Sequence, residues 1–180
     1  MRAVVLVGFM GAGKTSVGRT LARRLGWVFD DLDDLVEHRE GRTVEEIFRQ
    51  SGEAGFRAAE RRALQELIAQ LSRAPRVIGL GGGAFVQPEN AAILARTGLT
   101  VVFLDAPVEE LWRRCQLDRQ HRPLRQSEEQ FWRLYEERKP AYLKATIRID
   151  TAGKDVEAVT AEVACSLDFG HPAEGQWFPS

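Results

Sequence analysis

The sequence is poor in several features, and each shortage excludes a class of protein. Its only cysteines, Cys115 and Cys165, are far apart and lack the paired spacing of a zinc site or a disulfide scaffold. They indicate unbridged thiols in a reducing compartment. No apolar run approaches the roughly 20 residues that span a membrane, and the run before Gly8 is too short for a secretory signal. We therefore expect a soluble, cytoplasmic protein.

Charge of one sign is also lacking. The chain has 25 Lys and Arg against 26 Asp and Glu, a net charge of −1. This balance gives no global attraction to nucleic acid or to a membrane surface, so we expect neither as a partner. Lysine is scarce as well, and arginine supplies nearly all the positive charge. Where arginines surround a site, their planar forks suit the bidentate binding of anions.

The most informative segment that is present is a phosphate-binding loop. It reads Gly8-Phe9-Met10-Gly11-Ala12-Gly13-Lys14-Thr15, and it follows the buried-strand pattern of residues 3–7 and precedes the helical pattern of residues 16–25. Glycines let the backbone turn its N–H groups toward phosphate oxygens, and the helix N-terminus adds partial positive charge. Lys14 can reach the outer phosphates, and the Thr15 hydroxyl can hold Mg²⁺. The motif predicts binding of a nucleoside triphosphate.

Strand and helix patterns alternate along the chain, which is typical of a parallel sheet. Strands are predicted at residues 3–7, 28–31, 77–80, 99–104 and 147–150. Helices are predicted at residues 32–39, 44–50, 55–71, 88–96, 108–115, 128–144 and 155–167, besides the one after the loop. We expect an α/β P-loop NTPase fold, a five-stranded parallel sheet with helices on both faces. In such sheets ligands bind at the carboxyl ends of the strands.

Two segments do not fit the sheet. Residues 116–126 are polar and arginine-rich, and we expect a mobile lid there; residues 169–180 show no periodicity, and we expect a disordered tail. The main domain is predicted to cover residues 1–168. No guanine-specificity motif or transporter signature is present in the sequence. A single compact domain with a polar lid is typical of kinases of nucleotides or small metabolites.

Five further elements give a specific resemblance. They are Phe29-Asp30-Asp31-Leu32-Asp33, Gly55-Phe56-Arg57-x-x-Glu60, Gly81-Gly82-Gly83, Arg122-Pro123-Leu124 and Arg138-x-Pro140-x-Tyr142. In order and spacing, over residues 3 to about 150, the set resembles the shikimate kinase family. The resemblance implies transfer of the ATP γ-phosphate to the 3-hydroxyl of shikimate, with shikimate and ATP as partners. We expect a monomer, because no extra hydrophobic helix face stands out in the sequence.

The resemblance also implies roles for the residues that bind the acceptor. Arg57 and Arg138 match the family's pair for the shikimate carboxylate. Asp33 matches the aspartate that bonds the hydroxyls and takes the proton of the attacking oxygen, and the backbone of Gly81, Gly82 and Gly83 can approach the ring. From the residues alone, the aspartates can instead cap a helix, the glycines can form a tight turn, and Arg57 can pair with Glu53 or Glu60.

On the nucleotide side, Asp31 matches the carboxylate that holds Mg²⁺ beside Thr15, and Lys14, Asp33 and Arg122 are the predicted catalytic residues. The predicted ATP-binding residues are Gly11, Ala12, Gly13, Lys14, Thr15, Ser16, Arg114 and Arg122. Arg113 is an alternative to Arg114 at the adenine. Two rival functions stay open at this point: a kinase of another small hydroxy acid such as gluconate, and a catalytically silent protein that binds nucleotide or shikimate.

Overall fold

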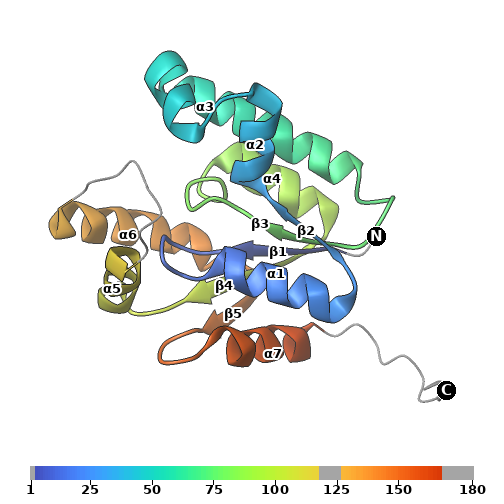
Figure 1. Cartoon of the computed structure of the whole chain (residues 1–180), viewed down its shortest axis with the longest axis vertical. Coiled ribbons are helices and arrows are strands. Elements are labelled where there is room, and N and C mark those ends of the chain that lie inside the picture. Colours follow the sequence, from blue (N-terminus) through green and yellow to red (C-terminus); the bar gives the residue numbers. More distant parts are fainter. Residues whose placement is uncertain (1–2, 118–126, 168–180) are drawn as a thin grey trace.

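The protein is a parallel sheet with helices on both faces, as the alternating pattern predicts (Figure 1). The computed structural model describes residues 3–117 and 127–167. The described residues contain five strands: β1 Ala3–Val7, β2 Val28–Asp31, β3 Arg76–Gly79, β4 Thr100–Asp105 and β5 Ile147–Asp150. The third lies one residue earlier than predicted and the fourth one residue later.

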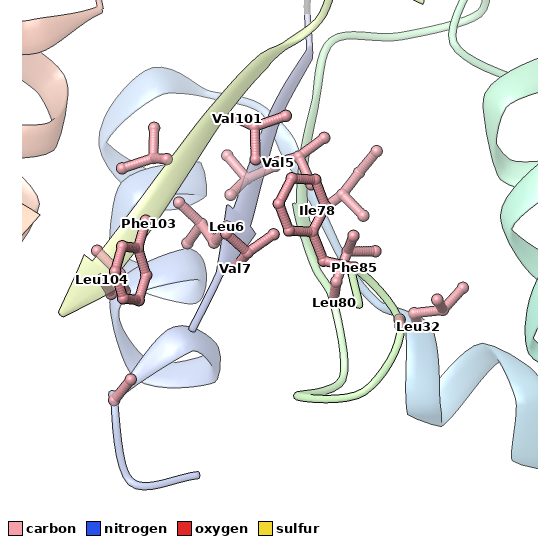
Figure 2. Close-up of a cluster of buried hydrophobic side chains, with 14 of the residues drawn as sticks. Val5, Leu6, Val7, Leu32, Ile78, Leu80, Phe85, Val101, Phe103 and Leu104 are labelled. Atoms are coloured by element: carbon pink, nitrogen blue, oxygen red, sulfur yellow. The ribbon is translucent and has the colours of Figure 1, made fainter. Parts of the chain in front are cut away.

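All strand pairs are parallel, in the order β2-β3-β1-β4-β5. The central strand β1 is entirely buried because it has a neighbour on each edge and helices on each face. Val5 pairs with Ile78 on one side and with Val101 on the other, and these side chains lie together in the core (Figure 2). The carboxyl ends of β1, β2 and β3 therefore meet at one edge of the sheet.

Helices cover both faces of the sheet. The helix α1 (Lys14–Leu25) packs beside α7 (Val156–Ser166) on one face, and α4 (Pro88–Thr97) lies on the other with the long α3 (Val44–Ala69), as the blue, orange and green ribbons of Figure 1 show. The remaining helices are α2 (Leu32–Glu40), α5 (Val108–Leu117) and α6 (Glu128–Tyr142). Capping boxes start α3 at Thr43 and α6 at Ser127.

Besides shifts of one or two residues at several element ends, two predicted features differ more clearly from the structure. The predicted helices at 44–50 and 55–71 meet within α3, where Gly52 has φ 68° and ψ −178° and breaks the helical geometry between them. Gln116 and Leu117 were predicted to open the lid, but they form the end of α5, with both side chains exposed. The rest of the predicted lid and the predicted tail fall at 118–126 and 168–180, outside the described residues.

The contact between α1 and β2 is unusually close at Gly18. A Cβ added there would lie 2.3 Å from Cε2 of Phe29, so only glycine lets the helix approach that strand. We expect Gly18→Ala to lower the free energy of unfolding by about 1–2 kcal/mol, because overpacking outweighs the gain in helix propensity of about 1 kcal/mol. Urea denaturation measures this. In a Phe29→Leu background the same change should be neutral or stabilising, and destabilisation of equal size in both backgrounds would contradict the account.

Candidate active site

The phosphate loop joins β1 to α1 and is closed by its own lysine. Lys14 Nζ donates to the carbonyl oxygens of Gly8 (2.9 Å) and Phe9 (3.1 Å). Gly11 has φ 80° and Gly13 has φ 85°, a region that glycine adopts without strain. Since α1 begins at Lys14, the amides of its first turn have no helical acceptor and provide an anion site. The loop predicted from sequence is therefore already formed.

Thr15 and Asp31 lie side by side at the edge of the loop. The Thr15 hydroxyl donates to Asp31 Oδ2 at 2.9 Å, while Asp31 Oδ1 accepts from the Asp33 backbone N–H at 3.1 Å and caps α2. Asp31 can therefore cap α2 through one carboxylate oxygen while the other oxygen faces the proposed metal position beside Thr15. Two hard oxygen donors, with phosphate and water in the other positions, suit Mg²⁺. The described residues contain no group of three or more His, Cys, Asp and Glu side chains that could hold a metal.

The run Gly81-Gly82-Gly83 follows β3 and lies under the side chains of the predicted acceptor site. None of the three has a positive φ, so their conformation does not require glycine. Lack of space does require glycine at two of the positions. A Cβ on Gly81 would lie 2.5 Å from Asp33 Oδ1, and a Cβ on Gly83 would lie 2.5 Å from Arg57 Nη2. The glycines therefore let a carboxylate and a guanidinium settle directly on the backbone.

Arg57 is held by two acids of its own helix. Its Nη1 lies 3.1 Å from both carboxylate oxygens of Glu60, and its Nη2 lies 3.4 Å from Glu53 Oε1. Its guanidinium also lies over the Phe56 ring, 5.2 Å from the centroid. The pairings with Glu53 and with Glu60 that the sequence left open are thus both present, and they fix the direction of the guanidinium toward Gly83.

Glu60 is the most deeply buried acid of this cluster, with 1% of its surface exposed. Burial raises the pKa of Glu60 to about 7, while the positive charges of Arg57 and Arg138 pull it down and Asp33 pushes it up. The acid therefore balances part of the charge of the two arginines only when it is ionised.

Arg138 reaches the same place from α6. Its Cζ lies 5.9 Å from the Phe9 ring centroid, and a Cβ on Gly82 would lie 3.5 Å from its Nη1 and 3.6 Å from the Gly8 carbonyl oxygen. The glycine run, the phosphate loop and Arg138 are thus in contact. Arg138 makes no direct ion pair with any acid in the described ranges 3–117 and 127–167, so only the longer-range charge of Glu60 offsets it.

Arg114 links the phosphate loop to the loop after β5. It donates to the Thr151 carbonyl oxygen at 2.7 Å, to the Thr151 hydroxyl at 3.0 Å and to the Gly11 carbonyl oxygen at 3.5 Å. Glu110 orients it through an ion pair of 2.6 Å. Of the two candidates, Arg114 is therefore the one that bonds both the phosphate loop and the loop after β5.

The structure brings nearly all the predicted site residues to one edge of the sheet. Arg122 is the exception, since it lies outside the described residues. Sequence reasoning gave no role to Phe9 or Glu110, whereas it placed Thr151 in the loop expected beside the adenine. The spacing of four residues between Glu110 and Arg114 could have indicated their pairing, but no local pattern indicates that Phe9 packs against Arg138.

The raised pKa of Glu60 makes a prediction for stability. Between pH 4.5, its ordinary value, and about 7, the folded chain keeps a proton that the unfolded chain has released, so the unfolding free energy falls as pH rises through this window. Relative to Glu60→Gln, wild type should lose roughly 2–4 kcal/mol across it. Urea denaturation of both proteins from pH 5 to 8 measures the difference, and a difference independent of pH would contradict the account.

Comparisons with known proteins agree with this geometry. The shikimate kinase family model matches residues 10–168. A shikimate kinase of Geobacter metallireducens is 44% identical over 172 residues, covering 93% of each chain. The crystal structure of shikimate kinase from Bacteroides thetaiotaomicron superposes with a TM-score of 0.82 at 32% identity, covering 92% of this chain and 98% of that one.

A second solved structure, shikimate kinase from Acinetobacter baumannii in complex with shikimate, has a TM-score of 0.80 at 35% identity and covers 91% of each chain. Together with the predicted motifs, the parallel sheet and the assembled site, these matches establish that the chain belongs to the shikimate kinase family.

Proposed function

We propose that the protein transfers the γ-phosphate of ATP to the 3-hydroxyl of shikimate, giving shikimate 3-phosphate and ADP. One observation carries the proposal beyond the family match. A carboxylate (Asp33) and two guanidinium groups (Arg57 and Arg138) lie on one glycine run that itself contacts the phosphate loop. That arrangement suits an acceptor that carries both a hydroxyl and a carboxylate.

The acceptor's charge is matched by Arg138 more than by Arg57. Arg57 is already paired with Glu53 and Glu60, whereas Arg138 makes no direct ion pair in the described residues and interacts with Glu60 only at longer range. A carboxylate that bridges the two guanidiniums completes the charge balance with charge-assisted hydrogen bonds. The ring of the acceptor would then lie over Gly81, Gly82 and Gly83, with its hydroxyls toward Asp33.

For the transfer itself, Asp33 accepts the proton of the attacking hydroxyl at a carboxylate oxygen, while Lys14 and the amides of the loop hold the phosphates. Thr15 and Asp31 would hold Mg²⁺, which supplies neutralisation of phosphate charge when bound. Positioning of the two substrates suffices, so we propose direct in-line transfer without a phosphoenzyme. Arg122 from the lid is proposed to close over the transferred group, by resemblance to the family.

The remaining ATP-binding residues follow from the same placement. Gly11, Ala12, Gly13 and Ser16 are proposed to hold the phosphates with Lys14 and Thr15, and Arg114 to lie beside the adenine. No helix among the described residues is both long and apolar enough to cross a membrane. A monomeric state and a cytoplasmic location stay predictions from the sequence.

The first prediction concerns the carboxylate. Arg138→Ala should weaken shikimate binding by roughly 2–5 kcal/mol, the scale for removing one partner of a buried charge pair, and leave the KM for ATP near wild type. Arg133→Ala is the matched control, since Arg133 is exposed on the same helix. Equal losses of both ligands would contradict the role. Arg57→Ala should weaken shikimate binding similarly but also lower stability, because it strips the buried Glu60 of its partner.

A second prediction concerns the proton. Asp33→Asn keeps the size of the side chain and removes its basicity, so kcat should fall by about 10²- to 10⁴-fold while the fold and ATP affinity persist. Steady-state kinetics and an ADP titration measure the two quantities. Near-normal turnover would remove Asp33 from proton transfer.

The proposed function is tested by coupled ADP release with Mg²⁺-ATP, comparing shikimate with quinate, gluconate and nucleoside monophosphates. Turnover with shikimate alone is expected. Turnover with gluconate or another acceptor instead would show that the protein is a kinase but that shikimate is not its substrate. Binding of the ligands without turnover would indicate a catalytically silent relative.

A further inference from the structure

A buried tyrosine supports the glycine run from below. Tyr142, in the last turn of α6, has no exposed surface, and its ring stacks on Phe103 with centroids 5.2 Å apart and planes at 28°. Its hydroxyl donates to a single backbone acceptor, the carbonyl oxygen of Gly82. The phenol thus joins α6 to the middle of Gly81-Gly82-Gly83.

This hydrogen bond fixes the orientation of one peptide unit. In a trans peptide the C=O and N–H groups point in opposite directions, so the carbonyl of Gly82 directed at Tyr142 turns the N–H of Gly83 away from it. Glycine on both sides leaves rotation of this unit almost unhindered by side chains. Within the described residues, the Gly83 N–H donates to no protein acceptor. Tyr142 therefore holds an available donor in one direction.

The same hydroxyl lies beside Arg138, one helical turn earlier on the same face of α6. A Cβ on Gly82 would lie 3.6 Å from the Tyr142 hydroxyl and 3.5 Å from Arg138 Nη1, so both groups converge on one backbone position. Burial raises the pKa of Tyr142 to about 12, although the charge of Arg138 opposes the rise. The hydroxyl consequently keeps its proton at working pH and can always donate.

We propose that Tyr142 is a positioning residue for the acceptor: it sets shikimate affinity through the Gly82–Gly83 peptide and Arg138, without touching either substrate. The inference rests on the proposed function, since it assumes that shikimate lies on this backbone. Among the described residues, the Tyr142 hydroxyl donates to Gly82 and not to the phosphate loop, so nucleotide binding should not change when the hydroxyl is lost.

The test is Tyr142→Phe, which removes the hydroxyl and keeps the ring on Phe103. We expect the KM for shikimate to rise about 10-fold, the order expected when one hydrogen bond to a positioned group is lost. The KM for ATP and kcat should stay within about 2-fold, because Tyr142 does not act on the reacting atoms. Both values come from the ADP-release assay.

Tyr135→Phe is the matched control. Tyr135 is a second buried tyrosine of α6, and its hydroxyl bonds to Asp105 Oδ1 at 3.3 Å and to the Ala106 carbonyl oxygen at 3.5 Å, away from the glycine run. Its loss should lower Tm to a similar extent and leave the shikimate KM unchanged. If both variants lose Tm and total activity in parallel, with wild-type KM values, Tyr142 is purely structural and the proposal is overturned.

The wild-type protein provides a second measurement that does not depend on the variants folding. Shikimate should shift the amide resonance of Gly83 in a ¹H–¹⁵N spectrum, and an unmoved resonance at saturation would overturn the proposal. Failure of the proposed function can be distinguished from failure of the positioning role, because in that case the wild-type protein itself does not phosphorylate shikimate. If the wild-type protein phosphorylates shikimate and Tyr142→Phe keeps the wild-type KM for shikimate, only the positioning role is overturned.

Discussion

The parallel pairing of β1 with β3 on one edge and β4 on the other is the constraint on which the site depends. It places the phosphate loop after β1, Asp31 at the end of β2 and the glycine run after β3 at a single edge of the sheet. Thr15 therefore bonds to Asp31, and the Asp33 side chain lies against Gly81, although the members of each pair are far apart in sequence. The buried core of β1, β3 and β4 makes this arrangement rigid (Figure 2).

Close approach and charge balance complete the site on that edge. The absence of Cβ atoms at Gly81 and Gly83 lets Asp33 and Arg57 rest on the backbone, which sets their separation. Of the two arginines, Arg57 is fixed by ion pairs with Glu53 and Glu60, whereas Arg138 lies over the Phe9 ring and, within the described residues, makes no direct ion pair although it feels the charge of Glu60. One guanidinium is thus oriented in advance and the other is left for the ligand. This division suits a small acid better than a neutral sugar.

Motifs whose geometry is local could be predicted from the sequence, and those that depend on packing could not. The phosphate loop and the Asp31–Thr15 pair follow from residues next to strand ends, so the sequence indicates them directly. The contact of Arg114 with the loop after β5 could not be predicted, because its partner Thr151 lies 37 residues away in sequence. The reason for Gly81 and Gly83 also needed the structure, because it is the side chains of other segments that require the space. Phe9 belongs to the phosphate loop and Tyr142 to the Arg138-x-Pro140-x-Tyr142 motif, but neither motif indicates that Phe9 packs against Arg138 or that Tyr142 bonds to Gly82.

The most direct test of the central claim is a crystal structure of the protein with shikimate and Mg²⁺-ADP. The account predicts the shikimate carboxylate within hydrogen-bonding distance of Arg57 and Arg138, a ring hydroxyl on Asp33, and the ADP phosphates in the loop before α1. Shikimate bound with its carboxylate away from both arginines, or with no hydroxyl on Asp33, would contradict it.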